Sequence, residues 1–172
     1  MSGAAPGQRA GRLFWILAWG AALALATVYF GRWEQARHNP NQAPESRRGS
    51  DFIEVHLASN HQGHYLLDGQ INGQTVTFLL DTGATDVAIP KALAKRLGLK
   101  AGAPISISTA NGRATAYRTR LQHLQLGAIG LDHVTALIVP DMDGDEVLLG
   151  MSALKQLDFT QRDGTLVLRQ TP

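Results

Sequence analysis

The chain has 172 residues, of which 44% are hydrophobic and 17% charged, a composition that fits one folded domain and excludes a disordered or fibrous protein. It contains no cysteine, which excludes a disulfide framework, a thiol nucleophile and a cysteine-ligated metal. Residues 1–50 hold six arginines and two glutamates, whereas residues 51–172 hold ten basic and twelve acidic side chains, so the folded part lacks the basic surface of a nucleic-acid-binding domain.

An uncharged apolar run covers residues 13–30 and is just long enough to cross a bilayer as a helix. Arginines flank it on both sides, and Trp15 and Trp19 are among its aromatic residues. We expect residues 1–12 to form an N-terminal tail and residues 13–30 a transmembrane anchor. A cleaved export signal is the alternative, because residues 24–26 read Ala-Leu-Ala, a small-x-small cleavage pattern. A short head before a first apolar segment usually stays in the cytoplasm, so the rest of the chain would face outward.

Residues 31–50 are polar and contain Pro40 and Pro44 among several asparagine and serine residues. Such a composition predicts a flexible linker. The folded domain would then cover residues 51–172.

Short apolar or alternating runs, separated by turn signals, follow from Asp51 and predict an all-β domain. Strands are expected at residues 52–58, 64–71, 74–80, 105–110, 113–120, 133–139 and 165–169. The pairs Asn72-Gly73, Asn111-Gly112 and Asp163-Gly164 fit tight hairpin turns, because these residue types tolerate the positive φ that such turns require. Two short helices are expected at residues 91–97 and 151–157, the first bounded by Pro90 and Gly98.

A weak internal repeat is also present. Residues 70–97 read as strand, turn, apolar strand, loop, short apolar strand and helix, and residues 121–157 repeat that order with few identical side chains. We interpret this pattern as a duplicated β-unit.

The most informative motif is Phe-Leu-Leu-Asp-Thr-Gly-Ala at residues 78–84, in which an apolar strand ends at a carboxylate. Gly83 permits a tight turn, and its amide and its neighbours' amides can hydrogen-bond the Asp81 carboxylate. The alternative is that this motif is an ordinary turn at the end of a strand, without a catalytic role.

This stretch resembles the active-site loop of retropepsin-like aspartic proteases. Two further segments match in order: Val-Leu-Leu-Gly at residues 147–150, followed by a helix, and residues 108–117, which occupy the position of the substrate-covering flap. The resemblance extends over residues 52–169. With its N-terminal apolar run and Leu-Leu-Gly-Met-Ser at residues 148–152, the chain looks like the membrane-anchored bacterial members.

The resemblance implies a β-barrel of the acid-protease type with short helices, acting as an aspartic endopeptidase on protein or peptide substrates without a cofactor or metal. Asp81 would be the catalytic aspartate, Thr82 would bond across a dimer axis, and Gly83 would orient the peptide backbone. Ala84 would lie beside the carboxylate, and the tip at Asn111 and Gly112 would close over the substrate. The bacterial members also imply an inner-membrane protein whose protease domain faces the periplasm.

Only one Asp-Thr-Gly occurs in the chain, whereas the chemistry needs two carboxylates that share a proton. We therefore expect a homodimer that brings two Asp81 side chains together. Viral members carry an Asp after the Ala and an Arg after the second-motif Gly, and these form an ion pair that supports the dimer. This chain has Thr85 and Met151 there, so the viral interface cannot be transferred.

Other functions find less support in the sequence. His56, His61 and His64 do not share one face of a strand, which argues against a metal-dependent hydrolase. The acidic residues 141–146 lack the spacing of an EF-hand calcium loop. The rival hypothesis is a membrane-anchored binding or scaffolding module that retains the fold without turnover, although such a module has no need of the intact Asp81-Thr82-Gly83 set.

Overall fold

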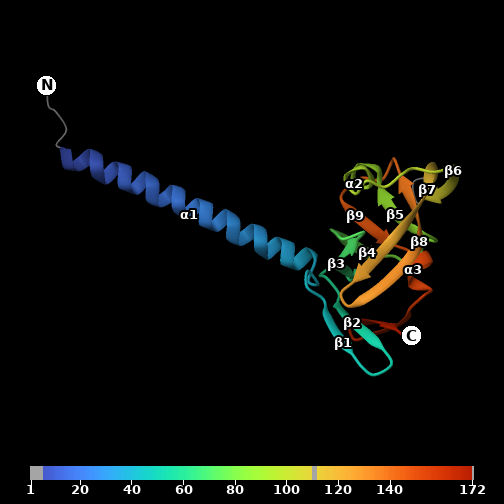
Figure 1. Cartoon of the computed structure of the whole chain (residues 1–172). Helices are drawn as coiled ribbons and strands as arrows, with labels where there is room; N and C mark the ends of the chain where they lie inside the picture. Colours follow the sequence, from blue (N-terminus) through green and yellow to red (C-terminus); the bar gives the residue numbers. More distant parts are fainter. Residues whose placement is uncertain (1–5, 110–111, 172) are drawn as a thin grey trace. The chain divides into compact units, whose positions relative to one another are not determined.

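The computed structural model describes residues 6–109 and 112–171 and divides the chain into two compact units, residues 1–37 and 38–172. The first unit consists of helix α1, and the second is mainly β (Figure 1). The elements are α1 (Pro6–His38), β1 (Glu45–Arg48), β2 (Ile53–Ala58), β3 (Leu66–Ile71), β4 (Gln74–Leu80), β5 (Val87–Pro90), α2 (Lys91–Arg96), β6 (Pro104–Thr109), β7 (Gly112–Leu126), β8 (Ile129–Val139), β9 (Glu146–Leu149), α3 (Met151–Leu154), β10 (Asp158–Arg162) and β11 (Thr165–Gln170).

Helix α1 contains a segment, Phe14–His38, that is long and apolar enough to cross a membrane, and its apolar 18-residue window has a mean hydropathy of 1.7. Among the described residues, every exposed large hydrophobic side chain except Phe159 belongs to this helix. The helix extends beyond the expected end at residue 30, because residues 31–38 contain no proline and, apart from Gly31, no strong helix breaker. It stops at His38, just before Asn39 and Pro40, where the residue preceding a proline disfavours helical backbone.

The segment expected to be a linker contains ordered structure that belongs to the second unit. Asn41 is buried, and its side chain donates to the carbonyls of Ala58 and Leu66 at 2.9 and 2.6 Å and accepts from the amide of Ala58 at 2.8 Å. Strand β1 then pairs antiparallel with β2. The boundary expected at residue 51 is therefore corrected to residue 38. The Asn41 side chain bonds backbone groups of Ala58 and Leu66 and so ties this segment to the second unit, whereas a linker would bond to water.

The second unit consists of two sheets. One is four-stranded, in the order β1-β2-β11-β10, and the other is seven-stranded, in the order β3-β4-β9-β5-β8-β7-β6. A further pairing of β3 with β7 closes the larger sheet on itself, which confirms the expected all-β barrel. The main core lies on one face of the larger sheet and includes Phe78, Ile89, Leu121 and Leu149, all fully buried.

The internal repeat is visible in the strand pairing. The unit β3-β4-β5-α2 and the unit β7-β8-β9-α3 contain the same elements in the same order. Strand β4 pairs parallel with β9, and its counterpart β8 pairs parallel with β5. Strands of each repeat unit therefore pair with strands of the other unit. This exchange brings the loop after β4 next to the end of β9.

Candidate active site

Asp81 lies directly after β4, where that strand runs parallel to β9. Leu80 pairs with Leu149, and the Asp81 amide continues the ladder by donating to the Leu149 carbonyl at 3.2 Å. The side chain is half-buried, and its Oδ1 accepts a hydrogen bond from the Gly83 amide at 2.8 Å. The expected turn, in which glycine lets a backbone amide hold the carboxylate, is therefore present. A carboxylate in this position is fixed by the backbone and still reachable by water.

The rest of the Asp81 loop is held by the segment that follows β9. The amide of Met151 donates to the carbonyl of Ala84 at 2.8 Å, and the amide of Ser152 donates to the carbonyl of Thr85 at 2.9 Å. Thr85 and Met151 stand where viral relatives carry an ion pair, and here main-chain hydrogen bonds join the two segments. Backbone contacts thus stabilise the loop without a charge at either position.

Gly150 makes this close approach possible. A Cβ at this position would lie 2.3 Å from the Asp86 carbonyl oxygen and 2.8 Å from the Ala84 carbonyl oxygen. Both are backbone atoms, which cannot rotate away as a side chain would. The glycine of the second motif is therefore explained by packing against the loop that carries Asp81.

Thr82 and Gly83 are exposed, whereas Ala84 is half-buried. The structure brings four of the expected site residues, Asp81 to Ala84, together in one loop. The exposed part of that loop leaves the Thr82 hydroxyl free to meet a group from outside the chain, since no hydrogen bond ties it to the residues that the structure describes.

Ser152 also positions the site, and the sequence alone did not reveal this role. Its buried hydroxyl accepts from the Val87 amide at 3.0 Å and donates to the Thr135 carbonyl at 2.7 Å. It thereby joins α3 to β5, which follows the Asp81 loop, and to β8. The only sequence signal was a serine in the first turn of a predicted helix. Serine is common at such positions and rarely forms a hydrogen bond with a residue distant in the chain.

Replacing Ser152 by Ala should lower the free energy of unfolding by about 1–3 kcal/mol, because it leaves the buried Val87 amide without an acceptor. Urea denaturation of the full chain, followed by far-ultraviolet circular dichroism, measures this change. Ser106→Ala, at an exposed position of β6, is the matched control and should leave the midpoint unchanged. An unaltered midpoint for Ser152→Ala would contradict the role of the hydroxyl.

The expected flap is the hairpin of β6 and β7. Thr109 pairs with Gly112, Gly112 has φ of +109°, and the Thr109 hydroxyl donates to the Gly112 carbonyl at 2.8 Å. Asn111, expected at the tip, lies outside the described residues. No hydrogen bond joins Gly112 to the Asp81 loop in residues 6–109 and 112–171.

A small apolar cluster lies on the face of the larger sheet opposite the main core. Ala116 of β7 and Leu137 and Val139 of β8 form it, and half-buried apolar residues from β5, β6 and the loop before β9 pack against it. The latter are Ala88, Ile105, Ile107 and Met142.

Within the part of the chain that the structure describes, no group of three or more histidine and acidic side chains is placed to hold a metal ion. In the acidic segment, Oε1 of Glu146 lies 2.6 Å from Nε2 of His38, and Oδ1 of Asp145 lies 3.4 Å from Nη1 of Arg96. These contacts give the acidic residues structural partners.

Comparison with known proteins agrees with this geometry. Residues 67–156 match the family described as gag-polyprotein putative aspartyl protease. The structure is similar to the crystal structure of a retropepsin-like aspartic protease from Rickettsia conorii, with a TM-score of 0.60 and 27% identity, covering 74% of this chain and 95% of that one.

Two curated bacterial proteins are also similar. One is an uncharacterized protein encoded in the cobV 5′ region of Sinorhizobium sp, 32% identical over 111 residues, which are 63% of this chain and 48% of the relative. The other is an uncharacterized protein of Rickettsia prowazekii (strain Madrid E), 27% identical over 161 residues, which are 85% of this chain and 65% of the relative. The matches thus span about half to two thirds of these relatives.

Proposed function

The chain belongs to the family of retropepsin-like aspartic proteases described as gag-polyprotein putative aspartyl proteases, and from that premise we propose that it is an aspartic endopeptidase. Its substrates are proteins or peptides that bind in an extended conformation. The observation that carries the proposal is the Asp81 carboxylate, half-buried and held at 2.8 Å by the Gly83 amide at the junction of β4 and β9.

Hydrolysis needs a pair of carboxylates that share one proton. The ionised member removes a proton from water, and the protonated member donates to the carbonyl oxygen of the peptide bond. The attack forms a tetrahedral intermediate, which collapses when the leaving nitrogen is protonated. In this mechanism Gly83 and Ala84 line the peptide beside Asp81.

The second carboxylate comes from another copy of the chain, so the active form is a homodimer with two-fold symmetry. The repeated unit supplies no substitute, because its counterpart of the Asp81 position falls in the loop at residues 140–143, between β8 and β9, without an Asp-Thr-Gly. In this dimer the exposed Thr82 faces the second copy and bonds to its counterpart.

The hairpin of β6 and β7 covers the bound peptide. The turn between the two strands, which the sequence assigns to Asn111 and Gly112, closes over the substrate. Gly112 has a φ of +109°, a backbone conformation open to glycine because it lacks a Cβ. The half-buried side chains of Ala88, Ile105 and Ile107, which pack on the buried cluster of Ala116, Leu137 and Val139, contact apolar side chains of the substrate.

Helix α1 anchors the protease unit, residues 38–172, in the inner membrane of a bacterium, with that unit in the periplasm. The apolar residues 13–30 form the membrane-spanning part. Holding both copies in one membrane raises their local concentration and favours pairing.

The test of this function is cleavage of an unfolded protein by the purified full chain in detergent. We expect cleavage that the Asp81→Asn variant lacks and that a metal chelator leaves unchanged. Binding of the unfolded protein without cleavage would favour a scaffolding module instead, and inhibition by the chelator would favour a metal-dependent hydrolase.

A further inference from the structure

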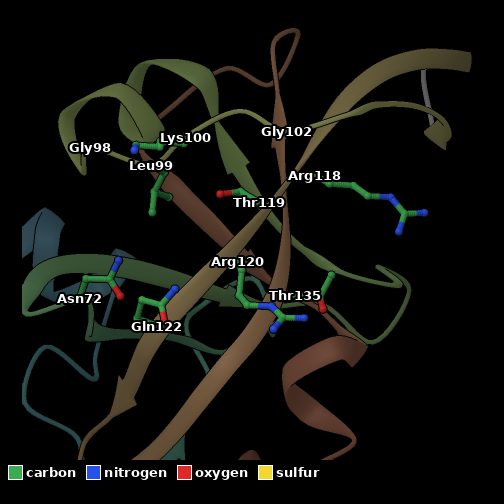
Figure 2. Close-up of a pocket in the computed structure, with 10 residues that line it drawn as sticks. All are labelled: Asn72, Gly98, Leu99, Lys100, Gly102, Arg118, Thr119, Arg120, Gln122 and Thr135. Atoms are coloured by element: carbon green, nitrogen blue, oxygen red, sulfur yellow. The ribbon is translucent and has the colours of Figure 1, made fainter.

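A cavity of about 600 Å³ lies between residues 98–102, which follow α2, and strand β7. Its lining includes Lys100, Arg118 and Arg120 and no acidic side chain. Figure 2 shows that Arg118 and Arg120 extend from β7 toward the same side, with Thr135 of β8 beside the end of Arg120, whereas Lys100 points away from them. We call Arg118 and Arg120 the arginine pair.

The arginine pair has no partner of opposite charge. Both side chains are exposed, and neither forms an ion pair or a side-chain hydrogen bond with the residues that the structure describes. By contrast, Arg96 lies 3.4 Å from Asp145 and Arg169 lies 3.6 Å from Glu54. Both side chains lie on one side of β7 (Figure 2), so a carboxylate bound on that side would be stabilised by two positive charges.

The backbone beneath the pair is firmly held. The Arg118 carbonyl accepts from the Gly102 amide at 2.8 Å, and the Arg118 amide donates to the Ala103 carbonyl at 3.0 Å. Thr135 lies directly opposite Arg120 in the pairing of β7 with β8, and its hydroxyl adds a neutral donor. A carboxylate beside Arg120 would therefore meet one planar fork and the Thr135 hydroxyl, and Arg118 would add a second positive charge on the same side of the strand.

The arginine pair shares a sheet face with the apolar cluster. Alternation along β7 puts Ala116, Arg118 and Arg120 on one side, and Ala116 belongs to that cluster. The strand register gives one row across the sheet, from Leu148 of β9 through Ala88 and Leu137 to Arg118. Leu148 precedes Leu149, whose carbonyl binds the Asp81 amide, so this row starts beside the catalytic loop.

The length of the row sets the position of the ligand. Three strand spacings separate Leu148 from Arg118, which is about 14 Å, the length of about four residues of extended peptide. A side chain about four residues from the scissile bond therefore reaches the arginine pair.

We propose that Arg118 and Arg120 bind the carboxylate of an aspartate or glutamate in the polypeptide substrate, about four residues from the cleaved bond. This inference rests on the proposed function and adds a substrate class to it, namely polypeptides with an acidic residue at that distance. A polypeptide is favoured over a small free anion as the ligand. The row of residues begins at the catalytic loop and ends at the arginine pair, so a polypeptide bound at that loop would continue toward the pair.

The test compares peptides that differ only by Glu or Gln, placed in turn at three to five residues on each side of the scissile bond. For the full chain in detergent at low salt, we expect kcat/KM to be about three- to tenfold higher for Glu than for Gln at one position, and the difference to fade as salt is added. The Arg118→Gln/Arg120→Gln variant should cleave both peptides equally, and Arg118→Glu/Arg120→Glu should prefer Lys at that position. Arg162→Gln, at an exposed arginine of β10 in the other sheet, should keep the preference for Glu.

Equal kcat/KM for Glu and Gln at every position would overturn the inference while leaving proteolysis itself intact. Equal cleavage combined with inhibition by inorganic phosphate, lost in Arg118→Gln/Arg120→Gln, would overturn it in favour of a small-anion site. Failure to cleave even the Gln peptides would instead refute the proposed function on which the inference rests.

Discussion

Replacing Asp81 by Asn should reduce peptide hydrolysis by at least about 10²–10⁴-fold, the usual effect of losing an essential general base. Asparagine has nearly the shape of aspartate, and its side-chain oxygen can still accept from the Gly83 amide, which donates to Asp81 at 2.8 Å. The fold should therefore survive, while the charge that activates water is lost. The measurement is kcat/KM on one peptide, together with the midpoint of unfolding for both proteins.

The matched control for this variant is Asp86→Asn, in the same loop. Asp86 is half-buried, and its backbone carbonyl is the group that packs against Gly150. Its side chain has no part in the proposed chemistry, so Asp86→Asn should retain most of the activity. Full activity in Asp81→Asn would move the chemistry to another residue.

Replacing Gly150 by Ala should destabilise the protein by about 1–3 kcal/mol or more, the cost of forcing an extra methyl group into a packed site. The new Cβ would collide with the carbonyl of Asp86 at 2.3 Å, so either β9 or the Asp81 loop must move. Because the loop carries the catalytic carboxylate, kcat should fall as well, even at temperatures where the variant is folded.

The effect of Gly150→Ala is measured by denaturant unfolding and by kcat at a temperature below the transition. Gly130→Ala is the control, because a Cβ there would meet only the movable ring of His123, at 3.1 Å. A Gly150→Ala variant as stable and active as the wild type would show that the close packing of the loop against β9 has no consequence.

The sequence predicted the parts of the fold that depend on local signals. Strands with alternating burial were found, and the turns at Asn72 and Asp163 have the expected positive φ of 50° and 49°. The Asp81 loop was found because carboxylate, hydroxyl and glycine occur together after an apolar strand. These features depend only on residues that are neighbours in the chain, so they can be predicted from a sequence pattern.

Strands β1 and β10 were missed because every residue in them is exposed, so neither shows an alternation of polar and apolar residues. Asn41 was assigned to a linker because a buried polar residue with several hydrogen bonds looks the same in sequence as a solvated one. The backbone groups that pack on Gly150, and the Val87 amide that bonds to Ser152, lie about 65 residues away in the chain, and only the folded backbone brings them together. Long-range polar contacts and close packing are therefore what the sequence did not reveal.

The claim at the centre of this account is that two copies of the chain each supply one Asp81. It is tested most directly by mixing full-length wild-type chain with increasing amounts of Asp81→Asn chain under conditions in which the partners exchange. If catalysis needs two Asp81 side chains, an equal amount of variant should lower the activity per wild-type chain to about half, because random pairing gives half of the wild-type chains an inactive partner. Activity per wild-type chain that stays constant at every ratio would contradict the shared site and place the whole catalytic centre within one chain.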